Sequence, residues 1–181
     1  MDSTSSPNTR SDDRTLTIRS TVDPATGTPA CLIEWGAIQA RLTPDVVHTT
    51  ARDLMAAAAA AESDVALLAF LREDVGVDNN QALAHMLAHV RERRPVPAGR
   101  TALRIEAVAG ADTGRPYVHI ARGSMKGCLT PDEARGMGQI WTEAAAAAQI
   151  DARLRYALGE WNHLTPDDIE RLFAIMRSVQ R

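Results

Sequence analysis

The chain is poor in several residue types that define specialised classes of protein. Its 181 residues include two cysteines, a single lysine and only 4% aromatic residues. So few cysteines exclude a scaffold built on disulfides. The uninterrupted apolar runs end well short of the roughly 18 residues that a membrane-spanning helix needs, so we expect no membrane insertion. Residues 1–13 are polar and lack the apolar centre of an export signal, which predicts a disordered leader on a cytoplasmic protein.

What the chain does contain is typical of a globular protein. Apolar residues make up 45% of it and charged residues 24%. The net charge of −3 argues against bulk binding to nucleic acid. That charge is unevenly divided, because residues 1–94 carry 9 basic and 13 acidic side chains whereas residues 95–181 carry 11 and 10.

The sequence of the first half returns in the second half. Residues 16–73 align with residues 103–160 without a gap, at a constant offset of 87. Of the 58 paired positions 20 are identical, and only five of these belong to an alanine run. The others include turn residues and the block Leu-Thr-Pro-Asp at 42–45 and 129–132. We therefore interpret the chain as a tandem duplication.

Each repeat is predicted to begin with three antiparallel strands. Apolar and polar residues alternate from residue 16 onward, and proline and glycine then mark a turn. The next strand places Cys31, Ile33 and Trp35 on one face. Gly36 and Gly123 favour tight hairpin turns, because glycine accepts a positive φ, and a short third strand follows each of them.

The Leu-Thr-Pro-Asp block predicts the start of a helix in each repeat. Thr43 or Thr130 can cap free backbone N–H groups, proline suits the first helical position, and aspartate meets the positive end of the helix dipole. Thr130 and Glu133 also match the capping-box pattern. The helix from residue 44 would extend to about residue 73, although a break near Asp64 and Asp151 explains the pattern equally well.

Small residues recur at alternating spacings of four and three along each long helix, from Val47 to Leu68 and from Ala134 to Arg155. Such a seam allows close approach, so we expect the long helices to pack on each other or across a shared sheet. The high helix propensity of alanine is the plainer explanation of the same pattern. A second, shorter amphipathic helix follows in each repeat.

These elements predict an α+β fold, a tandem duplication of a β-β-β-α-α unit with pseudo-two-fold symmetry. Antiparallel sheets would pack on long alanine-rich helices, and the two copies would bury each other's apolar faces as in a fused homodimer. The expected divisions are a leader at 1–13, repeat 1 at 14–94, a linker at 95–100 and repeat 2 at 101–181.

No motif for metal binding or catalysis stands out. His85 and His89 are four residues apart on an expected helix, a spacing that can hold a metal ion. They fall on the face opposite Leu83, where solvent is expected, so we predict no metal site. The segment 160–163 brings together a carboxylate, an amide and an imidazole without a nucleophile, so we predict no catalytic residues and no cofactor.

Two surfaces are candidates for binding. Arg104, Tyr117, His119 and Lys126 are expected on the outward face of the second repeat's sheet, where they would combine phosphate contacts with a stacking aromatic ring. A solvated face with scattered charges is the alternative. In the first repeat, the outward Leu32 and the neighbouring Trp35 suggest an apolar patch for a partner protein or a second copy, although a core position explains the tryptophan equally well.

A hairpin followed by Leu-Thr-Pro-Asp-Glu-Ala and an alanine-rich helix, as at 129–148, resembles small uncharacterised modules of streptomycetes and related actinobacteria. The strong preference for arginine over lysine suits such genomes. This resemblance carries no assigned activity. The strand–turn–strand–helix order is also similar to the dimerisation domain of an actinobacterial nucleoid-associated family, but the Arg-Gly-Arg element with which that family reads DNA is missing here, so the similarity implies oligomerisation alone.

The sequence therefore favours a non-enzymatic cytoplasmic interaction or regulatory protein, which acts through a protein partner or through self-association. Two alternatives stay open. One is a nucleic-acid-binding regulator that uses the basic sheet face of the second repeat. The other is a small-molecule site at the junction of the repeats, where equivalent units often leave a cleft.

Overall fold

The computed structural model describes residues 15–95, 99–110, 114–159 and 164–179. The expected leader at 1–13, the segment 160–163 and the central part of the expected linker at 95–100 lie outside the described residues.

The described chain folds into two three-stranded antiparallel sheets and four helices, an α+β architecture as predicted. Sheet 1 consists of β1 (Leu16–Val22), β2 (Pro29–Trp35) and β3 (Ile38–Leu42), in the order β1-β2-β3. Sheet 2 consists of β4 (Arg104–Ala109), β5 (Pro116–Arg122) and β6 (Met125–Leu129), in the order β4-β5-β6. The helices are α1 (Pro44–Glu73), α2 (Asn80–Glu92), α3 (Pro131–Gly159) and α4 (Pro166–Val179). The order β-β-β-α-α thus occurs twice.

The hairpins follow the turn residues that the sequence offers. Gly36 and Gly123 join the second and third strands of their sheets with φ values of 55° and 57°. These values lie in the left-handed region, where a side chain would be strained, so the prediction of glycine-dependent turns is confirmed. Period-2 alternation then turns one face of each sheet toward the helices, with Ile33 of β2 and Ile120 of β5 buried there.

The helix starts differ between the two halves. Before α3, the Thr130 hydroxyl accepts a hydrogen bond from the Glu133 backbone N–H at 3.3 Å, and the Glu133 carboxylate accepts one from the Thr130 N–H at 2.7 Å. These bonds form the predicted capping box, and the backbone bond is the main cause that lowers the pKa of Glu133. The prediction that Thr43 caps α1 is wrong, because its side chain makes no capping hydrogen bond. Val46 stands where the capping box needs a carboxylate.

The two long helices are unbroken and pack on each other, so the alternative of a break near Asp64 and Asp151 is wrong. They approach closely where α3 carries Gly138. A Cβ atom built on that glycine would lie 2.9 Å from the Ala51 carbonyl oxygen and 3.0 Å from Met55 Cγ of α1. Glycine is therefore required for this crossing, because no larger residue leaves room for the facing backbone.

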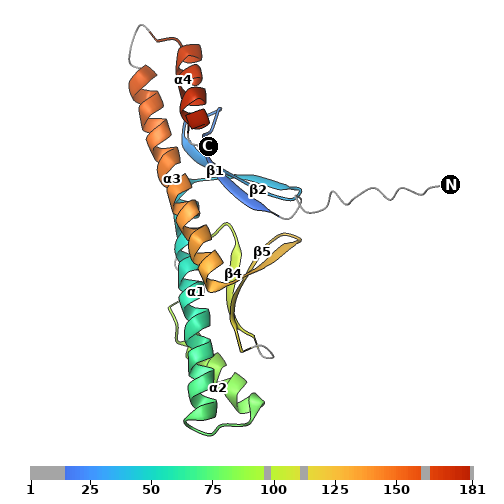
Figure 1. Ribbon diagram of the computed structural model, residues 1–181. Helices are drawn as coiled ribbons and strands as arrows, with labels where there is room; N and C mark the ends of the chain where they lie inside the picture. The colour runs from blue at the N-terminus through green and yellow to red at the C-terminus, as the bar shows by residue number, and fades with distance from the viewer. Residues whose placement is uncertain (1–14, 96–98, 111–113, 160–163, 180–181) are drawn as a thin grey trace, which may run out of the picture.

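Each long helix covers the sheet of the other half of the chain. Helix α1, which follows sheet 1, packs on β4 and β5, whereas α3, which follows sheet 2, packs on β1 and β2. Figure 1 shows the two helices crossing near the middle of the molecule, with both sheets on one side of them. The expectation that the long helices contact each other is confirmed, and the alternative of one shared sheet is wrong. The exchange joins both halves in a single core, whose central members are Ile33, Trp35, Leu54, Val118, Ile120 and Trp141.

The short helices α2 and α4 lie at opposite ends of the molecule, each folded back on the long helix before it (Figure 1). Leu83 and Leu87 of α2 are buried against α1, and Ile169 and Phe173 of α4 are buried at the other end. The helix pairs α1–α2 and α3–α4 extend past the sheets, so the molecule is elongated (Figure 1).

Helix α1 is long and apolar enough to cross a membrane, judged by length and composition alone. By these criteria the expectation that no segment inserts into a membrane, which rested on the short apolar runs, does not hold for α1. In the folded chain, Ala51, Leu54 and Ala58 of α1 are fully buried, but only 22% of the apolar stretch of the helix is buried inside the protein.

The helix crossing can be tested with two glycines of α3. Gly138→Ala should lower the free energy of unfolding by about 1–2 kcal/mol, because the new methyl group overlaps the α1 backbone. Gly136→Ala is the matched control, since a Cβ there meets nothing within 4 Å and alanine favours a helix by about 1 kcal/mol. Urea unfolding measures both. Equal effects of the two changes would contradict the close approach.

The two cysteines should differ sharply in reactivity. Cys31 is buried beneath α3, with its Sγ 3.6 Å from the Ala144 carbonyl oxygen, and burial raises its pKa to about 11. At pH 8 only about 0.1% of such a thiol is thiolate. Iodoacetamide should therefore alkylate the exposed Cys128 of the native protein and leave Cys31 intact, as mass spectrometry would show. In urea both should react, and equal rates in the native state would refute the burial.

Candidate functional site

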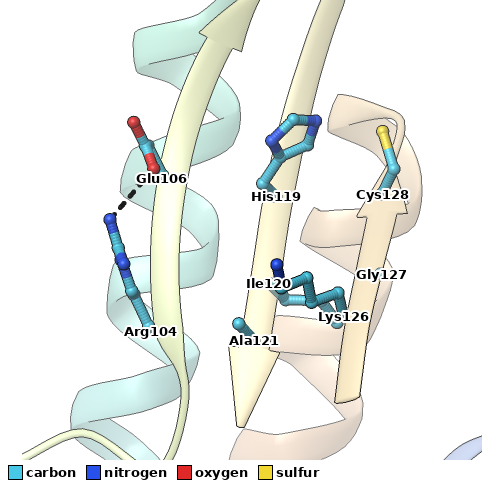
Figure 2. A pocket seen from close by; sticks show the side chains of 8 residues that line it. All are labelled: Arg104, Glu106, His119, Ile120, Ala121, Lys126, Gly127 and Cys128. Carbon is cyan, nitrogen blue, oxygen red and sulfur yellow. Dashed lines mark ion pairs between the residues drawn. The ribbon is translucent and has the colours of Figure 1, made fainter. Parts of the chain in front are cut away.

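The outward face of sheet 2 gathers three of the four residues that the sequence singled out for nucleic-acid binding. Strand register places Ala121 opposite both Arg104 and Lys126, and places His119 in the next row, between Glu106 and Cys128. These side chains surround a shallow hollow of about 520 Å³ on the face that turns away from the long helices (Figure 2).

The fourth residue and the charges complete this face. Tyr117 lies on the same face one row further along, opposite Val108, and does not line the hollow. Arg104 is paired with Glu106 at 3.6 Å, and both side chains are largely exposed (Figure 2). Because the carboxylate offsets the guanidinium, the hollow is only weakly basic.

The patch expected around Leu32 and Trp35 does not exist as an exposed surface. Trp35 is only 2% exposed, because strand alternation turns it to the helix side of sheet 1. A Cβ built on Gly127 of sheet 2 would lie 3.5 Å from the indole ring, so the ring fills the space beside the other sheet. The tryptophan is therefore a core residue, which corrects its place in the candidate patch. Leu32 does face outward, half-buried between Arg19 and Arg41 in the register.

Two grooves that sequence analysis missed run beside the free edges of the sheets. In the described part of the chain, β4 pairs only with β5 and β1 only with β2, so each keeps one edge open. The α1–β4 groove measures about 850 Å³ and is lined by Arg52, Asp53, Ala56, Arg91, Arg94 and residues 103–107. The α3–β1 groove measures about 530 Å³ and is lined mainly by Leu16, Ile18, Leu129, Met137, Ile140 and Trp141. No sequence pattern predicted these two grooves, because their lining depends on which helix covers which sheet.

A buried carboxylate holds two of the arginines at the α1–β4 groove. Asp64 of α1 is fully buried and accepts a hydrogen bond from Arg91 Nε at 2.8 Å and a second from Arg94 Nη2. Both arginine side chains are about one third exposed, so they line the groove while they tie α2 and the residues after it to α1. Nearby, burial raises the pKa of Asp53, and the positive charge of Arg52 opposes that rise.

A further groove of about 790 Å³ lies where the β1–β2 turn of the first half meets α3 and α4 of the second. Arg155 forms an ion pair with Glu170 there, and its guanidinium carbon lies 4.1 Å from the centre of the Phe173 ring. Ser20 donates a hydrogen bond to Asp151 at 3.5 Å beside it. This groove is open to solvent and lies at the junction where a small-molecule site was the alternative.

The histidines of α2 lie on its exposed face, where their sequence spacing placed them. The rings of His85 and His89 stack with their centres 6.3 Å apart. Within the described residues, no group of three or more His, Cys, Asp or Glu side chains is arranged to hold a metal ion.

Comparisons of the chain with protein-family models, with curated proteins and with solved structures found no match.

Replacing Asp64 should lower the free energy of unfolding far more than replacing Asp151, the residue at the equivalent position of the second half. Asp64→Asn should lower the free energy of unfolding by about 1–3 kcal/mol, because a buried group loses two charge-assisted bonds. Hydrogen exchange should speed up first in α2. Asp151→Asn, at the equivalent and partly exposed position, should change stability by less than about 0.5 kcal/mol. Equal losses for both variants would refute the role of Asp64.

Proposed function

We propose that this protein is a non-enzymatic cytoplasmic interaction module whose partner-binding sites are the two grooves beside the open sheet edges. The observation that carries the proposal is that, among the described strands, β1 and β4 each leave an edge unpaired directly beside a groove. Edge strands present rows of free backbone N–H and C=O groups, and proteins commonly use such edges to add a strand from a partner.

We further propose that the module arose by tandem duplication and has the plan of a fused homodimer. Three observations support this origin. Ala51 and Gly138, which meet at the helix crossing, are separated by the offset of the sequence repeat, since 138 minus 51 is 87. Leu16 and Leu103 occupy equivalent places in the two grooves. The exchange of helices between sheets is also the arrangement expected of a domain-swapped pair.

The proposal is tested by filling each groove. Ala56→Trp in the α1–β4 groove and Gly136→Trp in the α3–β1 groove both add a ring at an exposed helix position. Self-association, measured by analytical ultracentrifugation, or retention of proteins from a lysate on the immobilised chain should be lost in at least one variant. Ala66→Trp, an exposed α1 position outside both grooves, is the control and should behave as the unmodified protein.

Two results would refute this function. One is an unmodified protein that stays monomeric and retains no partner. The other is association that survives both groove-filling changes.

A second candidate function is nucleic-acid binding on the outward face of sheet 2, which the convergence of Arg104, His119 and Lys126 around one hollow favours. Binding to a single-stranded oligonucleotide should then weaken steeply with salt, and Lys126→Ala should weaken it several-fold. Arg41→Ala, at an exposed position of sheet 1, is the control for loss of one positive charge. Failure of the protein to bind heparin or oligonucleotides at low salt would remove this candidate.

A further inference from the structure

The two grooves have the same place in the fold but opposite chemistry. The α1–β4 groove is lined by four arginines, at positions 52, 91, 94 and 104, and by two carboxylates, Asp53 and Glu106. Counting the buried Asp64 behind them, the groove keeps an excess of one positive charge. The α3–β1 groove is lined by apolar side chains and a single carboxylate, Glu133, with no basic side chain among its described lining residues.

The positive charges are available to a partner in different degrees. Arg91 and Arg94 are held by Asp64, and Arg104 has only an exposed contact with Glu106. Arg52 is exposed and forms no hydrogen bond or ion pair within the described residues, although it acts electrostatically on Asp53. Burial raises the pKa of Asp53, and the positive charge of Arg52 opposes that rise.

The shape of the groove selects an extended ligand. Its wall on the sheet side is five consecutive residues, 103–107, of which 104–107 belong to β4. Five extended residues span about 16 Å at about 3.3 Å each. A compact anion would contact only part of such a wall, whereas a peptide strand beside β4 would follow its whole length and pair with its free backbone groups. The floor on the helix side is formed by Ala56, Ala57 and Ala60, small residues that leave room for a backbone.

We propose that the α1–β4 groove binds an extended acidic segment of a partner protein, which adds to sheet 2 as a strand beside β4 and places carboxylates against Arg52, Arg91 and Arg94. The inference rests on the proposed interaction function and specifies the chemistry of one partner. The apolar α3–β1 groove does not share this preference, so the two edges take different partners from one scaffold.

The test uses the full chain and a fluorescent peptide of about eight residues in which glutamate and valine alternate, a length that covers the groove wall. Fluorescence anisotropy should show saturable binding of this peptide and none of the matched lysine–valine peptide. Arg52→Glu should weaken binding by about tenfold or more, because it replaces an attraction with a repulsion. Arg153→Glu makes the same charge change at an exposed position of α3 outside the groove and should leave binding unchanged.

Two further measurements separate strand addition from simple charge attraction. Two further Glu–Val peptides carry N-methyl groups, one on every glutamate and the other on every valine. One of the two should lose affinity, because strand pairing uses the N–H group of every second residue. Ala56→Trp should abolish binding by filling the groove, while Gly136→Trp in the other groove should not. Unfolding curves that match the unmodified protein would confirm that each variant is folded.

Several results would overturn the inference. One is failure of the acidic peptide to bind, or equally strong binding of the lysine peptide. Another is binding of the acidic peptide that is unchanged by Arg52→Glu, or unchanged in both N-methylated peptides. A third is inorganic polyphosphate or an oligonucleotide that competes for the groove as well as the unlabelled acidic peptide does. If the acidic peptide fails but self-association or partner retention is still lost in Gly136→Trp, the interaction function stands and only the acidic specificity is refuted.

Discussion

The close approach of α1 and α3 at Gly138 is the constraint on which the rest of the structure depends. Because the two backbones nearly touch there, each helix crosses from its own half of the chain to the sheet of the other half. The single core and the two grooves beside β1 and β4 follow from that crossing. Small residues recur in the seam between the two helices, where Ala51, Ala58 and Ala145 are fully buried.

The α1–β4 and α3–β1 grooves have the same place in the fold but are lined by residues of different charge. Leu16 and Leu103, which are 87 residues apart, line the two grooves at equivalent places, whereas other lining positions differ between the grooves. Thus Asp53 stands where the other half has Ile140. Because different residues of one chain form the two grooves, their chemistry can differ, whereas the equivalent sites of a homodimer are identical.

Local signals in the sequence were sufficient for most elements. Gly36 and Gly123 mark turns because they need positive φ, and Thr130 with Glu133 marks a helix start through its own hydrogen bonds. The pairing of helix with sheet was beyond such signals, because equivalent repeats contain the same apolar faces and either helix could cover either sheet. The grooves and the bonds from Asp64 to Arg91 of α2 and to Arg94 just after it came only from the structure. For Trp35 the sequence left a core position and a surface position equally open, and burial decides for the core.

The exchanged helices also bear on how the chain reaches its native state. When the first half leaves the ribosome, the inner face of sheet 1 has no cover, because α3 has not yet been synthesised. Long-range contacts of this kind slow folding and leave apolar surface open to aggregation in the meantime. The first half is therefore expected to keep apolar surface exposed until the second half has been translated. A fragment that ends before α3 should aggregate and not fold as a stable unit.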